Sequence, residues 1–362
     1  MHLWSEKRTA HTTIPESLSA PAAAHVTAVS FSSTQGGNAI LAIGRADGRI
    51  SLWSPHDRDP RFDSEHPSPV SCVCFRPTTA KRASIREPSV TVNTEELLVG
   101  DEAGNVYFYS IEWPNEQDRD LFGWHGSMTL LARMSCHTQQ ICGLAWSADG
   151  ETFATGGNDN QMFVFETKKI LAPQKRRNKD AATVHVRNGS SSEGLAGQGE
   201  VISIAPGRQR HIFNLNAAVK AIAFAPWRAN LIAAGGGSND RCIHFFHTRS
   251  GAALATIDCY AQVTSLVWSV HKRELAATFG FAQPEHPFRV AVFSWPDCKM
   301  VVAIPWYGEE RALYAVAYPR CLVVATSDAS IKFHEVWSET SRRAGPSRLL
   351  EGSDTMEGPE IR

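Results

Sequence analysis

The sequence lacks several features that would assign it to a major functional class. Lysine and arginine total 36 and aspartate and glutamate total 37, so the formal net charge of −1 gives no general attraction to nucleic acid or anionic membranes. No apolar run approaches the length of a bilayer span, and the N-terminus lacks the basic, apolar and small-residue order of a signal peptide. We therefore expect a protein that binds neither nucleic acid nor membranes.

Signatures of catalysis and of cofactor binding are also missing. No nucleophile–base pair or metal-ligand spacing stands out, and the triple glycine at 235–237 lies between two strands instead of opening a helix. The eight cysteines are scattered, and Cys72 with Cys74 lacks the second pair or the histidine that a zinc site needs. These absences predict a protein with reduced thiols, no cofactor, no metal and no enzymatic activity.

What the sequence does contain is a sixfold repeat of one apolar strand pattern. Each copy reads V/I/L-x-x-V/I/L-x-F/W/Y and precedes a stretch of small residues, a sharp hairpin and a second alternating strand. Repetition of such a unit predicts an all-β fold, a β-propeller whose four-stranded blades surround an axis. The six copies are Val26–Phe31, Val70–Phe75, Ile141–Trp146, Val219–Phe224, Val263–Trp268 and Leu313–Tyr318. The alternating strands that follow the hairpins are Ile50–Trp53, Val106–Tyr109, Met162–Phe165, Ile243–Phe246, Val290–Phe293 and Ile331–His334.

Aspartates recur in the hairpin that precedes this alternating strand. They stand three residues before it in four copies, at Asp47, Asp159, Asp240 and Asp328. An aspartate carboxylate accepts backbone N–H bonds in a tight turn. His25 precedes Asp47 by the same interval that separates His137 from Asp159. This spacing predicts a buried histidine–aspartate hydrogen bond in each of these two blades, as in WD-repeat propellers.

The first residues of the chain add a seventh unit to the count. Met1–Ser5 matches Ile50–Ser54, which is a third blade strand, whereas the inner strand and hairpin that should precede it are absent from this sequence. We therefore predict seven blades with the first incomplete, residues 1–20 being its remnant in a truncated chain. An open ring leaves unpaired edges and exposed apolar faces. The alternative is a six-bladed ring with an irregular leader.

Two segments depart from the repeat. Residues 168–209 are rich in Lys, Arg, Asn, Gly and Ser, which predicts a disordered insertion loop within a propeller domain of residues 1–337. The basic run at 175–179 is either a nuclear-import signal or an ordinary solvated loop, and we expect the protein in the nucleus and cytoplasm. Residues 338–362 are polar and predict a flexible C-terminal tail that ends Ile-Arg.

Several longer stretches resemble one family of propellers. They are His137–Gly150 with Thr155–Asn160, Ala218–Trp227 with Gly235–Ile243, Gln262–Ser269, and the terminal Ile361-Arg362. Together they resemble the Fizzy and Fizzy-related activators of the anaphase-promoting complex, a ubiquitin ligase, and most of all the fungal meiosis-specific branch. The resemblance implies a substrate adaptor in cell-cycle or meiotic protein degradation, with the ligase and degron-bearing substrates as partners. The alternative is a generic WD-repeat scaffold for another protein assembly.

The resemblance also implies a receptor for KEN-type degrons on the top face of the propeller. Carried over by motif, its positions are Asn158, Asn160, Ser238, Gln262 and Arg311. Side-chain amides supply paired donors and acceptors for a peptide, and Arg311 suits a degron glutamate.

Two further sites of the family carry over with differences. For the destruction box, an acidic residue is expected after the last hairpin aspartate, but Ala329 follows Asp328 here, which predicts weak or altered use of that degron. Ile361 and Arg362 correspond to the tail that docks on a tetratricopeptide-repeat subunit of the ligase. The family's upstream motif Asp-Arg-Phe/Tyr-Ile-Pro-x-Arg has no match in this sequence.

Overall fold

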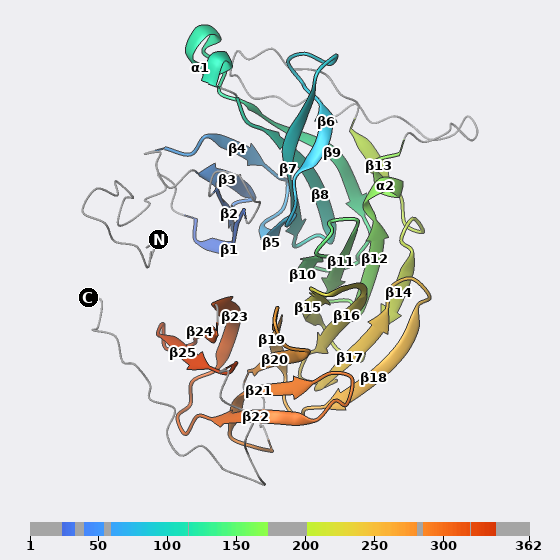
Figure 1. Cartoon of the computed structure of the whole chain (residues 1–362), viewed down its shortest axis with the longest axis vertical. Helices are drawn as coiled ribbons and strands as arrows, with labels where there is room; N and C mark the ends of the chain where they lie inside the picture. Colours follow the sequence, from blue (N-terminus) through green and yellow to red (C-terminus); the bar gives the residue numbers. More distant parts are fainter. Residues whose placement is uncertain are drawn as a thin grey trace.

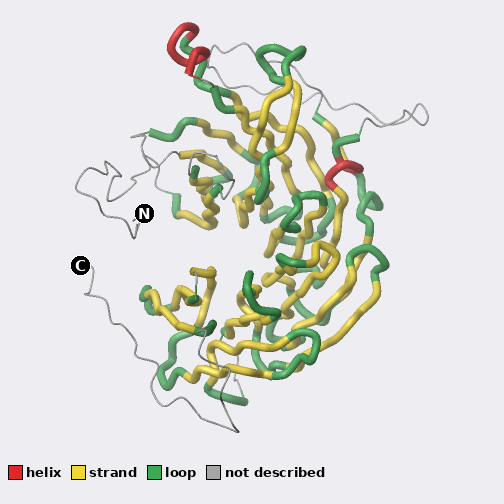
Figure 2. Tube along the Cα trace, in the orientation of Figure 1, coloured by secondary structure: helices red, strands yellow, loops and turns green. Residues whose placement is uncertain are grey.

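The computed structural model describes residues 24–32, 40–53, 59–114, 116–172, 201–280, 285–318 and 320–337. Antiparallel strands make up most of these described residues. The strands form successive sheets around a common centre (Figure 1), and the two helices lie at the periphery (Figure 2). These are α1 (Glu116–Phe122) and α2 (Thr167–Ile170). Among the described residues, no helix combines the length and apolar character that crossing a bilayer requires.

The described residues form six sheets that follow one another along the chain. The first contains β1 (Val26–Phe31), β2 (Leu41–Arg45), β3 (Arg49–Trp53) and β4 (Phe62–Glu65). The second contains β5 (Val70–Phe75), β7 (Thr91–Asp101), β8 (Asn105–Glu112) and β9 (Ser127–Ser135), with β6 (Ala80–Ala83) beside β7 and β13 (Ile202–Ile204) beside β9. The third contains β10 (Ile141–Trp146), β11 (Thr152–Gly157), β12 (Gln161–Glu166) and β14 (His211–Asn214).

The remaining three sheets continue the same order. The fourth contains β15 (Val219–Ala225), β16 (Arg228–Gly236), β17 (Cys242–His247) and β18 (Ala252–Asp258). The fifth contains β19 (Val263–Trp268), β20 (Glu274–Phe279), β21 (Phe288–Ser294) and β22 (Met300–Pro305). The sixth contains β23 (Ala312–Tyr318), β24 (Cys321–Thr326) and β25 (Ile331–Glu335). The predicted all-β propeller is confirmed, and the small-residue stretch of each repeat is itself the second strand of a blade.

One register repeats in every blade. The first residue of the inner strand lies opposite the last residue of the second strand, and the pairing then shifts by one residue. The residue before the inner strand accepts a backbone N–H bond from the residue after the second strand. In the third blade this bond runs from Asn158 to Gln140 at 2.9 Å. Equivalent positions can therefore be assigned from one blade to the next.

The core of the molecule lies between the blades. Val70 and Phe75 of the second sheet pack with Ile40 and Leu52 of the first sheet in one buried cluster. Each inner strand contacts the inner strand of the next blade in the same way. Removing this apolar surface from water contributes about 25 cal/mol per Å², which favours stacking each sheet on its neighbour.

In the sixth blade, the predicted register of the inner strand was wrong by one residue. Ala312 and Ala315 face the fifth sheet and are buried, whereas the template residues Leu313 and Val316 are 40% and 48% exposed. Because side chains alternate along a strand, a shift of one residue exchanges its two faces. Both faces of β23 carry apolar residues, so the sequence pattern alone fitted either register.

The predicted insertion loop is narrower than residues 168–209. Ile170 in α2 and Ile204 in β13 are buried in the cluster between the second and third sheets. β13 pairs in parallel with β9, and β14 forms the outer strand of the third blade. Residues 173–200 and the predicted tail, residues 338–362, lie outside the described residues.

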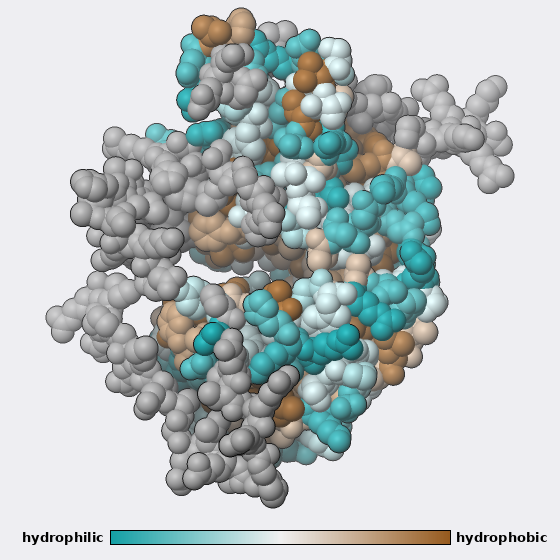
Figure 3. All heavy atoms as spheres, in the orientation of Figure 1, coloured by the Kyte–Doolittle hydropathy of each residue, from teal (hydrophilic) through white to brown (hydrophobic). Residues whose placement is uncertain are grey.

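The first and sixth sheets each leave one apolar face exposed. Figure 1 places these sheets on either side of an opening in the ring, and Figure 3 shows apolar surface on both sides of it. The predicted first-blade remnant, residues 1–20, lies outside the described residues, which form six blades, and the seventh blade remains a prediction. The exposed residues are Val26, Val29 and Phe31 on one side and Leu313, Val316, Ile331 and Phe333 on the other.

Candidate functional site

The five residues of the predicted KEN receptor lie at the same end of the blades. Asn158 and Asn160 belong to the hairpin between β11 and β12, and Ser238 belongs to the hairpin between β16 and β17. Gln262 and Arg311 each stand immediately before an inner strand, β19 or β23. In an antiparallel blade, the start of the inner strand adjoins the end of the second strand, so these connections share one face of the ring.

Local packing positions two of the amides. Asn158 Nδ2 donates to Gln139 Oε1 at 2.8 Å, and Asn158 itself is exposed. Gln262 is half-buried, and its backbone carbonyl accepts the backbone N–H of Gly280 at 3.0 Å. A Cβ at position 280 would lie 2.8 Å from Gln262 Oε1, so the glycine leaves space for the amide.

The backbone of Arg311 is held from both sides by one serine. Its N–H donates to Ser327 Oγ at 2.9 Å, and its carbonyl accepts the N–H of Ser327 at 3.1 Å. Arg311 is exposed at the rim of the sixth blade. The start of β23 is therefore fixed by main-chain and serine bonds that do not depend on the guanidinium.

The destruction-box position of the sixth blade lies at a left-handed turn. Ala329 has φ 65°, the same value as Asn160 in the third blade, and Gly48 and Gly104 hold this position in the first two blades. The alanine side chain has no carboxylate or other polar group that could pair with an arginine. Asp328 accepts hydrogen bonds from the Thr326 hydroxyl and from Ser330, and these bonds lower the pKa of Asp328 to about 2.

The predicted histidine–aspartate bond is present in the third blade. His137 Nδ1 donates to Asp159 at 2.9 Å, and the Thr155 hydroxyl donates to Nε2 at 2.8 Å. Burial lowers the pKa of His137, against the opposing effect of Asp159. In the first blade the prediction was wrong, because His25 is exposed and Asp47 accepts the backbone N–H of Arg49.

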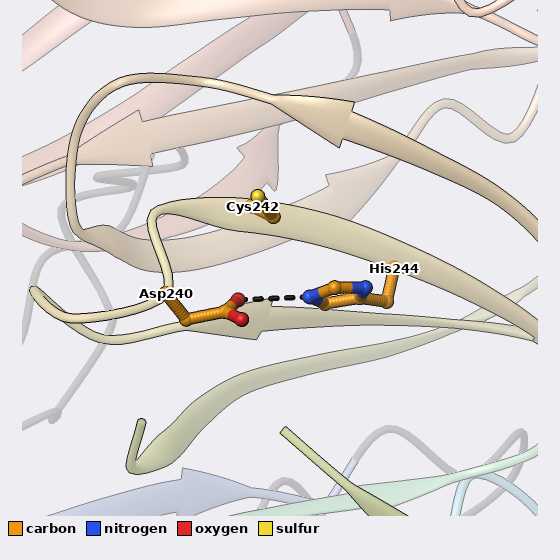
Figure 4. Close-up of side chains that lie close together, drawn as sticks. All are labelled: Asp240, Cys242 and His244. Carbon is orange, nitrogen blue, oxygen red and sulfur yellow. Dashed lines mark hydrogen bonds and ion pairs between the residues drawn. The ribbon is translucent and has the colours of Figure 1, made fainter. Parts of the chain in front are cut away.

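Two features near these residues were missed from the sequence. The first is a cavity of about 250 Å³ beside the connection to Gln262, lined by residues of the fourth and fifth blades that include Tyr260, His286 and Met300. Its walls come from separate blades, so no local motif signals it. The second is a cluster of Asp240, Cys242 and His244 (Figure 4). Its Asp-x-Cys-x-His spacing is readable in the sequence.

Part of the predicted site lies outside the described residues. This applies to Ile361 and Arg362 of the tail, and docking through them remains a prediction. Degron binding by the described residues is likewise a prediction, because what the structure establishes is their position, exposure and backbone support.

Known proteins resemble this chain in both sequence and fold. Residues 128–166 match the family described as WD domain, G-beta repeat. An uncharacterized WD repeat-containing protein of Schizosaccharomyces pombe is 29% identical over 83% of this chain and 48% of its own length. The meiosis-specific APC/C activator protein AMA1 of Saccharomyces cerevisiae is 28% identical over 94% of this chain and 52% of its own length.

A third relative and a solved structure are also similar to this chain. Meiotic fizzy-related protein 2 of S. pombe is 27% identical over 91% of this chain and 56% of its own length. A chain in the crystal structure of the mitotic checkpoint complex superimposes with a TM-score of 0.61 at 25% identity, covering 88% of this chain and 80% of that one. This chain spans about half the length of the curated relatives it matches. With the blade architecture, these similarities confirm the resemblance to the Fizzy and Fizzy-related family of WD-repeat proteins.

Proposed function

We propose that this chain is a substrate-recognition adaptor and activator of the anaphase-promoting complex in cell-cycle or meiotic protein degradation. The observation that carries the proposal is the position of five polar residues at one end of four consecutive blades. Similarity to a protein named as a meiosis-specific APC/C activator supports it. Its partners are the ligase and substrates that carry degrons, and it acts in the nucleus and cytoplasm.

The chemistry of this face suits a KEN-type peptide. The amides of Asn158, Asn160 and Gln262 each donate and accept hydrogen bonds, so they can pair with a peptide asparagine and its backbone. Arg311 supplies a charge-assisted bond to the peptide glutamate. Because main-chain bonds hold the loops that carry these residues, less conformational entropy is lost on binding.

Destruction-box binding is proposed to be weak or altered. Ala329 offers no carboxylate to a degron arginine, and the loss of such a partner costs about 1.5–3 kcal/mol, roughly tenfold or more in affinity. We also propose a ring of seven blades. A further blade would cover the exposed apolar faces of the first and sixth sheets, and burial of Val29 and Ile331 would favour it.

Docking on the ligase is assigned to the C-terminus. Ile361 offers an apolar anchor, and Arg362 offers a guanidinium together with the terminal carboxylate, a combination suited to a groove of a tetratricopeptide-repeat subunit. Each contact is weak, so simultaneous engagement of tail and substrate gives the avidity of the assembly.

Fluorescence anisotropy with a labelled KEN peptide tests the central proposal. Binding that weakens about tenfold or more in N158A and in Q262A would support it. The control is R249A, because Arg249 is exposed in the β17–β18 hairpin at the opposite end of the blades. Equal binding by all four proteins, or none by the unaltered chain, would favour the generic scaffold instead.

A further inference from the structure

A cluster of metal-ligand side chains lies in and beside the hairpin that carries Ser238. Asp240 in the hairpin and Cys242 and His244 in β17 occupy alternate positions, so their side chains share one face of the strand. A carboxylate oxygen, the thiol sulfur and a ring nitrogen of these residues all lie within 4.8 Å of one another. Figure 4 shows the Asp240 carboxylate and the His244 ring directed at each other beside the Cys242 thiol.

Neighbouring groups hold two of these ligands in place. His244 Nδ1 lies 3.3 Å from Thr256 Oγ1, and this contact directs Nε2 toward Asp240 Oδ2 at 2.8 Å. The other oxygen of Asp240 accepts the backbone N–H of Asn216 at 3.4 Å. A Cβ at Gly236 would lie 2.0 Å from Asp240 Oδ2, so only glycine leaves space for this carboxylate. Outer partners that orient a histidine and a carboxylate are typical of metal sites.

The hairpin does not need the Cys242 thiol or the His244 imidazole for its own stability. In the third blade, Asp159 supports the same turn, and Gln161 and Phe163 hold the positions equivalent to Cys242 and His244. The fourth blade therefore carries a thiol and an imidazole at positions where the third blade has neither group.

The charge around the cluster favours a cation. Asp258 pairs with Cys242 across β17 and β18, so a second carboxylate stands on the same side of the sheet as the thiol. Arg241 is the nearby opposing charge, and it lies 3.9 Å from Glu285. The carboxylates of Asp240 and Asp258 thus flank the thiol on a hairpin whose single arginine has an acidic partner.

We propose that Asp240, Cys242 and His244 bind a divalent transition-metal ion, for which zinc is the best match. Zinc accepts thiolate, imidazole and carboxylate ligands together, and three protein ligands leave a fourth position for water or an external donor. Zinc–ligand bonds of about 2.0–2.3 Å place tetrahedral ligand atoms roughly 3.3–3.8 Å apart. Small side-chain rotations from the present spacing reach this geometry. The ion replaces the Asp240–His244 hydrogen bond, and Thr256 then holds the proton on His244 Nδ1.

Cobalt(II) titration of the chelator-treated full chain tests this site. A tetrahedral site with a thiolate ligand is expected to give a sulfur-to-cobalt charge-transfer band that saturates at one equivalent and disappears when zinc is added. C242S should abolish the band, and H244N should weaken zinc binding about tenfold or more, measured by competition with a chromophoric chelator. The control C321S removes a partly exposed thiol in another blade and should leave the band unchanged.

Two results would overturn the proposal. One is the absence of a charge-transfer band from the unaltered chain at one equivalent of cobalt. The other is a band of full intensity in C242S. If C242S does not fold, as judged by circular dichroism, unchanged zinc affinity in H244N overturns the proposal by itself.

Discussion

Gln262 and Arg311 occupy the same position in adjacent blades. Each carbonyl accepts a backbone N–H from the residue after the second strand, Gly280 at 3.0 Å and Ser327 at 3.1 Å. These bonds involve only the main chain, so the side chains can be changed without removing the support of β19 or β23. Substitutions at these positions therefore separate peptide binding from folding.

Charge reversal at Arg311 should be rescued by the opposite reversal in the peptide. We expect R311E to weaken binding of a KEN peptide about tenfold or more, because a charge-assisted bond to the peptide glutamate becomes a repulsion. A peptide with lysine in place of that glutamate should bind R311E better than it binds the unaltered chain. Anisotropy titrations measure both, with R249E as the control; loss of binding without rescue would contradict the assigned contact.

A carboxylate at position 329 should restore destruction-box binding. Aspartate tolerates the left-handed conformation that Ala329 adopts, and it would offer a partner to the degron arginine. We expect A329D to increase affinity for a destruction-box peptide about tenfold. A peptide with alanine in place of the arginine is the control. If both peptides gain equally, the new carboxylate is not reading the arginine.

Acidification should destabilise the propeller through its buried histidines. Burial lowers the folded-state pKa values of His137, His66 and His334 below the ordinary value of 6.5. The unfolded chain then binds more protons than the folded chain, so the free energy of unfolding falls as pH drops through 6.5 toward the folded-state values. Urea unfolding at pH 7.5 and 5.5 measures this loss.

Substitution of His137 measures how much of this pH-dependent loss of stability comes from that histidine. H137Q should reduce the loss between the two pH values, while H25Q should retain it because His25 is exposed. H137Q should also lower stability at pH 7.5, since the bonds to Asp159 and Thr155 are altered. A protein that gains stability on acidification would refute the assignment.

Removal of the last two residues should separate ligase docking from substrate binding. Without Ile361 and Arg362, the chain should co-purify with the ligase less efficiently and bind a KEN peptide with unchanged affinity. Replacement of Arg362 alone by alanine keeps the carboxylate and should give a smaller loss. Unchanged co-purification after the deletion would count against this role of the tail.

The blade pattern was predictable because it depends on residues that are close together in the sequence. The inner strands of the first, second, third and fifth blades have the predicted bounds, and the β11–β12 hairpin carries the predicted bond between His137 and Asp159. β23 was misplaced by one residue because Ala312 and Leu313 both continue an apolar alternation. Only the packing of β23 against the fifth sheet distinguishes the two possible registers of this strand.

Features built by distant segments were not predictable. β13 is three residues long, and its pairing with β9 depends on tertiary contact across more than one blade. The Asp240, Cys242 and His244 cluster is local and was missed for another reason. The apolar strand pattern accounts for Ile243 but not for Cys242 and His244, which lie on the other face of the strand. The relative positions of loops from four blades likewise require the assembled ring.

The path of the chain around β13 has a consequence for solubility. From α2 at the third sheet, the chain reaches the outer margin of the second sheet, forms β13 there and returns to the third sheet as β14. β13 occupies N–H and C=O groups of β9 that would otherwise offer a template to a neighbouring molecule. This path thus links the second and third blades at their outer edges. It also covers an edge strand, β9, along which copies of the protein could aggregate.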